Sequence, residues 1–207
     1  RLLRGLGDRL HLESADVTLE AHPSTVNAPA LRELRDAGVT RLSLGAQSLD
    51  ARVLEACGRG DTVETVLPAV EAALATPFRD VNIDLMHGLP EQTSERWTAD
   101  LRRAVDLGVP SLTLYATVYL PAFQSRCETV GHHVPTAADR LAMYETAFEF
   151  LNAAGYPQPH FGAGAFARGG LNAHRRNVSL GLPTLGLGTW AYSSSGAFGW
   201  HNRYPTD

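Results

Sequence analysis

The chain has 207 residues, of which 44% are hydrophobic, and its formal net charge is −4. These values fit one soluble α/β domain with a sizeable core, and they exclude fibrous and disordered classes. The mild acidity and the absence of any Lys/Arg cluster argue against nucleic acid as a partner. No apolar run approaches the length of a membrane span, so we expect no membrane partner either.

The cysteine content points to a reducing compartment. The sequence has two cysteines, Cys57 and Cys127, and neither has a neighbour at metal-ligand spacing. We interpret them as ordinary thiols and expect no metal ligands among them. Together with the lack of a signal peptide, this predicts a cytoplasmic protein. The first residues already look helical and no Met precedes them, so we expect the sequence to be a piece of a longer protein.

Strand and helix patterns alternate through the first two thirds of the chain. The predicted strands are 17–20, 41–45, 81–86 and 111–116. The predicted helices are 28–37, 50–56, 62–75, 93–107 and 136–154. Four strands that are mostly followed by helices indicate a parallel β/α array. We expect this array to occupy residues 1–155 and a glycine-rich segment to occupy residues 156–207.

Polar or aromatic residues lie at or just after the carboxyl end of each predicted strand. They are Glu20, Gln47, Asp84 and Tyr115. In parallel β/α barrels the chemistry sits at this edge of the sheet. A turn or a helix cap explains any one of these residues, but four at equivalent positions favour the lining of one pocket. Carboxylate and amide oxygens accept hydrogen bonds from sugar hydroxyls, and the Gln amide adds donors.

Asp84 needs a partner because it lies in a strand that the pattern predicts to be buried. An unpaired buried carboxylate is unfavourable, and the partner is either protein or ligand. Arg59, between two glycines in "CGRGD", is either a surface arginine or a fork for a carboxylate ligand. A ligand with both a ribose and an amino-acid carboxylate would satisfy the whole set.

Three other motifs have weaker signals. His87 follows the third strand, and we expect it to face the mouth of the barrel and touch substrate or transfer a proton, although a plain turn residue is an equal alternative. His132 and His133 have no further ligand at useful spacing and are interpreted as loop residues. The stretch "GAGAFARGG" (162–170) lacks the Lys-Ser/Thr of a phosphate-binding loop and is interpreted as a flexible connection.

Four stretches together resemble one enzyme group. They are "TLEAHPSTV", "GVTRLSLGAQSLDARVLEACGRG", "VNIDLMHGLPEQT" and "FLNAAGYPQPHFGAGAFAR". The group is the radical S-adenosylmethionine (SAM) enzymes of the oxygen-independent coproporphyrinogen III oxidase type, often called HemN-like. It also includes the HemW heme chaperones, methyltransferases and cyclopropane-forming enzymes. The resemblance runs from about Val17 to Ser193.

The resemblance implies an α/β fold, a partial (β/α)6 TIM-type barrel that holds a [4Fe–4S] cluster and SAM, with four of its six strands in this chain. It places SAM contacts at Glu20, Gln47, Arg59 and Asp84. It also places a backbone or apolar contact beside the adenosine at Val118, and Tyr192 in a C-terminal segment that closes over SAM. By position in the barrel, Tyr115 and His87 are expected to face substrate.

The sequence also departs from that group. The cluster motif CxxxCxxC and the glycine-rich stretch that holds the SAM amino group are both absent, and we expect them upstream of Arg1. In addition, "HFGAGAFAR" (160–168) replaces a Glu-Ile-Ser-Asn type stretch of the chaperone subgroup. We therefore expect an enzyme more than a chaperone.

The expected activity is reductive cleavage of SAM to a 5′-deoxyadenosyl radical, which acts on a porphyrinogen or a natural-product substrate. The reaction would be an oxidative decarboxylation, a methylation or a cyclopropanation, with an electron donor such as flavodoxin. The alternative is a heme-binding chaperone of the same fold without turnover. A scaffold without any cofactor would leave the four strand-end residues unexplained.

Overall fold

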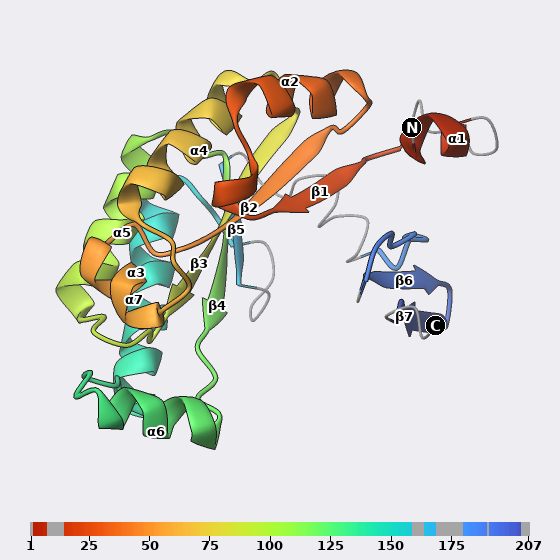
Figure 1. Ribbon diagram of the computed structural model, residues 1–207. Helices are drawn as coiled ribbons and strands as arrows, with labels where there is room; N and C mark the ends of the chain where they lie inside the picture. The colour runs from red at the N-terminus through yellow and green to blue at the C-terminus, as the bar shows by residue number, and fades with distance from the viewer. Residues whose placement is uncertain (1, 8–14, 159–163, 169–179, 190, 204–207) are drawn as a thin grey trace. The chain divides into compact units, whose positions relative to one another are not determined.

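The computed structural model describes residues 2–7, 15–158, 164–168, 180–189 and 191–203 (Figure 1). The chain divides into two compact units, Arg1–Gly170 and Leu171–Asp207. The division falls after residue 170, whereas we expected the glycine-rich segment to begin at residue 156. Within the described ranges, no helix has the length and apolar character needed to cross a membrane.

The first unit is built on one sheet in the order β1-β2-β3-β4-β5. Its strands are β1 (Thr18–Ala21), β2 (Arg41–Gln47), β3 (Asp80–His87), β4 (Ser111–Ala116) and β5 (Ala165–Ala167). The first four are parallel, and β5 joins β4 in the antiparallel sense. The predicted parallel β/α array is therefore confirmed.

Helices connect the parallel strands and cover one face of the sheet (Figure 1). The helices of this unit are α1 (Leu2–Gly7), the 3-10 turn η2 (Pro23–Thr25), α2 (Ala28–Asp36), α3 (Ala51–Cys57), α4 (Val63–Ala75), α5 (Ser94–Asp106), α6 (Pro121–Thr129) and α7 (Ala137–Ala153). Several begin at a side-chain cap: Asp50 accepts from backbone amides at the start of α3, and Thr136 forms a capping box with Asp139 at the start of α7.

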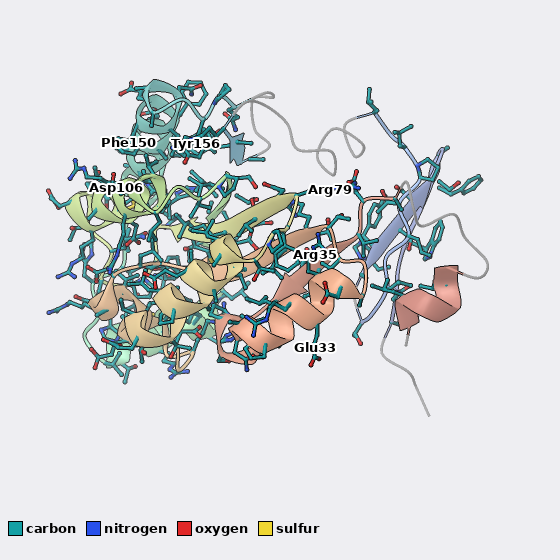
Figure 2. The ribbon with its side chains drawn as sticks, turned by 90° about the horizontal axis from the view of Figure 1, so that it is seen from above. Glu33, Arg35, Arg79, Asp106, Phe150 and Tyr156 are labelled. Atoms are coloured by element: carbon teal, nitrogen blue, oxygen red, sulfur yellow. The ribbon has the colours of Figure 1, made fainter. Side chains whose placement is uncertain are left out.

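The hydrophobic core lies between the helices and the sheet. Leu44, Ile83 and Leu112, on three neighbouring strands, are fully buried. They pack in one cluster with helix residues such as Trp97 and Met143. Exposed charges such as Glu33 and Asp106 lie on the outer side of the helices (Figure 2). Side chains alternate along a strand, so the other face of the sheet, which we call the inner face, receives the remaining set.

That inner face is polar. It holds the residues of β2, β3 and β4 that alternate with the apolar core positions, namely Arg41, Ser43, Asp80, Asn82, Asp84, Ser111 and Thr113. The strand register sets Ser43 beside Asn82 and Asp84 beside Thr113. Both faces of a parallel sheet are usually apolar. A polar inner face therefore indicates that this side serves a site.

Several elements were not predicted. Helix α6 follows β4 directly, and β5 lies within the stretch that we interpreted as a flexible connection. That interpretation is wrong for Ala165–Ala167, because Phe166 is fully buried in the core. The second unit contains a hairpin of β6 (Tyr192–Ser195) and β7 (Phe198–His201).

Candidate functional site

A chain of side-chain hydrogen bonds crosses the inner face at β2, β3 and β4. The Asn82 amide nitrogen donates to Ser43 Oγ at 2.9 Å and to Asp84 Oδ1 at 2.8 Å. Thr113 Oγ1 donates to Asn82 Oδ1 at 3.0 Å. Ser43 Oγ lies 3.5 Å from each oxygen of Asp84. The Asp84 carboxylate is thus oriented by protein groups, which answers part of the question that its position raised.

A second set of polar contacts fixes the amino end of the same face. Arg41 Nε donates to Asp80 Oδ2 at 2.7 Å, and Ser111 Oγ lies 3.0 Å from both oxygens of Asp80. Arg41 and Asp80 are largely buried, so each neutralises the other. This ion pair occupies the amino end of the inner face, so the candidate site is sought at the carboxyl end.

Gln47 ends β2 in an unusual backbone conformation. Its φ is 64°, and the Ser48 amide donates to the Ala46 carbonyl at 2.8 Å. A bond from residue i+2 to residue i around a positive φ is the pattern of the rarer, strained γ-turn. A Cβ atom on Gly45 would lie 2.8 Å from Gln47 Nε2, so the Gln47 amide lies over Gly45. Gly45 has the inner-face parity of Ser43, and Gln47 is therefore directed to the inner face.

Glu20 belongs to the same face through the strand register. It pairs with Ser43, which in turn pairs with Asn82, so the three residues form one row across β1, β2 and β3. The Glu20 side chain is exposed. Glu20, Gln47 and Asp84 therefore share the carboxyl-terminal part of the inner face.

Arg59 is tied to the turn after β1. Arg59 Nε lies 3.5 Å from Asp61 Oδ2, and His22 Nε2 lies 3.2 Å from Asp61 Oδ1. The Asp61 side chain is buried, whereas the Arg59 side chain is 43% exposed. Asp61 thus pairs electrostatically, without a hydrogen bond, with Arg59 and with the turn that follows β1.

His87 does not lie where we expected it. Its ring centroid is 5.9 Å from the rings of Trp97 on α5 and Tyr144 on α7. The side chain is buried, and burial lowers the pKa of the imidazole. The expectation that His87 faces the mouth of the barrel is wrong, because three positions beyond Asp84 the side chain points to the helix face.

The remaining predicted residues lie at the carboxyl end of β4 and in the second unit. Tyr115 has inner-face parity and is 48% exposed, and Val118 is 75% exposed just beyond β4. Both are therefore accessible on the first unit. Tyr192 begins β6, and its ring centroid lies 5.0 Å from that of His201. It belongs to the second unit.

The pattern of polar residues at strand ends did not indicate several residues of this site. Ser43, Asn82 and Thr113 are among them, because they lie inside strands. Polar residues at every second position of β3, as in Asp80, Asn82 and Asp84, were the available signal. Asp61 and the buried Asp100 on α5 had no such signal, because their partners lie far away in the sequence.

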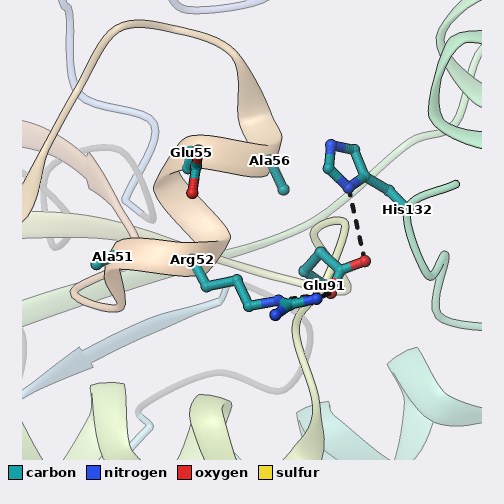
Figure 3. Close-up of a pocket in the computed structure, with 6 residues that line it drawn as sticks. All are labelled: Ala51, Arg52, Glu55, Ala56, Glu91 and His132. Carbon is teal, nitrogen blue, oxygen red and sulfur yellow. Dashed lines mark hydrogen bonds and ion pairs between the residues drawn. The ribbon is translucent and has the colours of Figure 1, made fainter. Parts of the chain in front are cut away.

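A hollow with charged walls lies apart from this face (Figure 3). It is lined by Ala51, Arg52, Glu55, Ala56, Glu91 and His132. Arg52 Nη2 lies 2.8 Å from Glu91 Oε2, and His132 Nδ1 lies 3.6 Å from Glu91 Oε1. Glu91 also accepts from the His133 amide at 2.7 Å, so it holds the loop after α6 in place. The two histidines have the loop role that we predicted for them.

The side chains on the inner face suit SAM but not the [4Fe–4S] cluster, the two groups that the resemblance implies. Carboxylate and amide acceptors with an arginine fork match the hydroxyl, ammonium and carboxylate groups of SAM. A cluster held by three thiolates does not fit, because the sequence has two cysteines. Burial raises the pKa of Cys57 to about 11. Over the ranges that the structure covers, no group of three or more His, Cys, Asp or Glu side chains is arranged to hold a metal.

Comparison with known proteins identifies the family. The sequence model of the family described as "Radical SAM superfamily" matches residues 2–104. The heme chaperone HemW of Escherichia coli K12 is 34% identical over 196 residues, which are 92% of this chain and 50% of HemW. The oxygen-independent coproporphyrinogen III oxidase of Pseudomonas aeruginosa is 31% identical over 145 residues, 70% of this chain and 32% of the oxidase.

The fold agrees as well. The structure of the E. coli coproporphyrinogen III oxidase HemN, described as a radical SAM enzyme, superposes with a TM-score of 0.78 at 24% identity. The superposition covers 98% of this chain and 50% of HemN. The superposition shows the shared fold, and the family model together with the HemW relative shows that the chain belongs to the radical SAM superfamily. Within it, its relatives are HemW and the oxygen-independent coproporphyrinogen III oxidases, and it spans about half the length of the HemW relative.

Proposed function

We propose that this chain is the SAM-binding part of a HemN-like radical SAM protein, with the site on the carboxyl-terminal part of the inner face. The observation that carries the proposal is the convergence of Glu20, Gln47 and Asp84 on that face, from three neighbouring strands. Ligands of open α/β sheets and barrels bind at the carboxyl ends of the strands.

Each of these side chains has a role that its chemistry supports. The Asp84 carboxylate accepts from the ribose hydroxyls of SAM, since a carboxylate has about four acceptor sites and Asn82 and Ser43 hold it in one orientation. Glu20 accepts from hydroxyl or ammonium donors, and Gln47 offers both an acceptor and donors. Arg59, anchored by Asp61, presents its guanidinium to the amino-acid carboxylate.

The apolar residues at the rim act on the remaining parts of the ligand. Val118 lies beside the adenosine, where its backbone or side chain contacts the base, and Tyr115 faces the substrate; both are exposed on the first unit.

The cofactors supply the chemistry, and these residues only position the cofactor SAM. SAM bound beside a reduced [4Fe–4S] cluster supplies a 5′-deoxyadenosyl radical that abstracts hydrogen from substrate. The cluster ligands come from chain outside these 207 residues, because the two cysteines present cannot provide three thiolates. The residues described here bind SAM, orient it and exclude water. An electron donor such as flavodoxin reduces the protein in the cytoplasm.

We propose a porphyrinogen or a natural product as the substrate, and oxidative decarboxylation, methylation or cyclopropanation as the reaction. The relatives support this range, since they include oxygen-independent coproporphyrinogen III oxidases. A second candidate is a heme-binding chaperone without turnover. It is supported by the 34% identity to HemW over 92% of the chain.

One experiment separates the two candidates. The full-length protein is purified without oxygen, its iron and sulfide are measured, and 5′-deoxyadenosine is assayed after reduction with SAM present. The enzyme predicts one cluster and formation of 5′-deoxyadenosine. A protein that carries the cluster and binds heme, but forms no 5′-deoxyadenosine with any reductant or substrate, is the chaperone.

A further inference from the structure

Side chains of helix α5 bind the turn that follows Gln47 through hydrogen bonds and an ion pair. Arg96, Asp100 and Arg103 are spaced at i, i+4 and i+7, so they share one face of the helix. Asp100 accepts from Ser48 Oγ at 2.6 Å and from the Leu49 amide at 3.1 Å. Arg103 Nη1 donates to the Leu49 carbonyl at 3.3 Å. The two residues directly after Gln47 are thus held from another element.

The next residue of the turn is held by the same helix. Arg96 Nη1 lies 2.8 Å from Asp50 Oδ1 and 2.9 Å from Asp50 Oδ2. Asp50 in turn caps α3 by accepting from the Arg52 and Val53 amides. The Asp50 amide donates to Ser48 Oγ at 3.1 Å, so Ser48 is bonded on both sides. The turn is therefore a rigid joint between β2, α3 and α5.

A rigid joint is needed because the Gln47 backbone is strained. A positive φ in a residue other than glycine is unfavourable and persists only where its surroundings impose it. Asp100 is 2% exposed, and it supplies two of the bonds that fix the turn. Gly45 provides the room that the Gln47 amide occupies on the inner face. Strain of this kind is concentrated at binding sites, where it keeps a side chain in one orientation.

We propose that Asp100 is a positioning residue that holds Gln47 in its γ-turn and thereby sets the affinity for SAM. The inference rests on the proposed SAM contact of Gln47. Asp100 lies on the helix side of the sheet and touches no ligand. Its influence on binding passes through Ser48 and Leu49 to the Gln47 side chain.

A double-mutant cycle tests the proposal in the full-length, cluster-loaded protein. The variants are Gln47→Ala, Asp100→Asn and the combination, and SAM affinity is measured by calorimetric titration. Asn keeps the shape of Asp100 but has only one acceptor oxygen for two donors. We expect the SAM dissociation constant to rise roughly tenfold for Gln47→Ala and roughly three- to tenfold for Asp100→Asn. The combination should bind no more weakly than Gln47→Ala alone, because Asp100 acts only through Gln47.

Two further measurements keep the test decisive. Hydrogen exchange at the Ser48 and Leu49 amides should accelerate in Asp100→Asn, which reports the turn without any ligand. Ser48→Ala, which removes the bond to Asp100 and the bond from the Asp50 amide, should show the same dependence on Gln47 and serves if Asp100→Asn does not fold. Asp106→Asn, an exposed carboxylate on the same helix, is the matched control and should leave SAM affinity unchanged.

The outcomes distinguish the two levels of the account. If Asp100→Asn weakens SAM binding equally with and without Gln47, or does not weaken it at all, the positioning role is overturned while the SAM contact of Gln47 stands. If Gln47→Ala itself leaves SAM affinity unchanged, the proposed contact of Gln47 fails, and the positioning role fails with it.

Discussion

Asn82 and Asp84 lie two residues apart on β3, and the Asn82 amide donates to the Asp84 carboxylate at 2.8 Å. Side chains two apart on a strand point to the same face. The same amide group is held on its other side by Thr113, from β4. The orientation of the Asp84 carboxylate is thus set by two strands before any ligand binds.

This relationship predicts that Asp84 contributes to stability as well as to binding. In Asp84→Asn the new amide is a weaker, uncharged acceptor for the Asn82 amide. We expect the free energy of unfolding to fall by about 1–2 kcal/mol, since hydrogen bonds to charged groups contribute more than neutral ones. Denaturant melts of the two proteins measure it. Thr113→Val, which removes the neutral bond to Asn82, should cost less. A variant as stable as the parent would contradict the network.

The buried Asp100 carboxylate predicts a pH dependence of stability. Burial raises its pKa from the ordinary 3.8 to about 7, against the opposing effects of the Ser48 and Leu49 hydrogen bonds and of Arg103, while the neighbouring Asp50 raises it further. Between these two pH values the folded protein holds a proton that the unfolded chain has lost. Stability should therefore fall as pH rises from about 4 to about 7 and stay level above.

The comparison with Asp100→Asn isolates that contribution. Relative to this variant, the parent should lose stability on the order of 2 kcal/mol between pH 5 and 7. His87 has the opposite sign in the same window, because burial lowers its pKa below 6.5 and its contribution grows as pH rises. Subtracting the two melting series removes the His87 contribution. Parallel curves for parent and variant would exclude a raised pKa at Asp100.

The burial of His87 predicts a structural role rather than a catalytic one. His87→Phe keeps an aromatic ring between Trp97 and Tyr144 and removes Nδ1, a buried atom without a hydrogen-bond partner in the described part of the chain, together with the ring's hydrogen bond to the Arg140 backbone. Because the two losses have opposite signs, we expect stability at pH 7 to change little, with unchanged SAM affinity and 5′-deoxyadenosine formation. Thermal melts and the assay check this. Loss of turnover in a well-folded His87→Phe protein would restore the proton-transfer role.

The entry into β5 depends on Gly164. Its φ is 59°, and an added Cβ would collide with the Leu114 carbonyl oxygen. The Gly164 carbonyl accepts from the Leu114 amide at 2.6 Å, so this contact begins the pairing of β5 with β4. Gly164→Ala should lower the free energy of unfolding by about 2 kcal/mol or more, as expected for strain at a positive φ. Gly131→Ala, also at positive φ but with open space around it, is the matched control and should cost less.

The sequence was informative where local pattern decides structure. The four parallel strands and the strand-end residues Glu20, Gln47 and Asp84 follow from alternation and from the position of polar residues at strand ends. The same alternation, counted on from Asp84, places His87 on the helix face, so that error was avoidable. Strand β5 has three residues in a glycine-rich stretch, which is too short for any periodicity.

Other features depend on contacts between distant residues. Asp100 lies 52 residues from Ser48, and nothing near it in the sequence marks its role. Asp61 is likewise distinguished by the approach of His22, which lies far from it in the sequence. The positive φ of Gln47 depends, in our proposal, on the hydrogen bonds that Asp100 of α5 accepts from Ser48 and Leu49. These groups orient the predicted site residues. Local sequence pattern does not encode that orientation, because it depends on contacts between residues far apart in the sequence.

Titration of the full-length, cluster-loaded protein with SAM, for the parent and for Asp84→Asn, tests the central claim most directly. Asp80→Asn, on the same strand and face but at the amino end, is the control. If Asp84 accepts from the ribose, SAM affinity should fall roughly ten- to a hundredfold in Asp84→Asn and stay unchanged in Asp80→Asn, at a temperature where all three proteins are folded. Unchanged affinity in folded Asp84→Asn would contradict the assignment of this face as the SAM site.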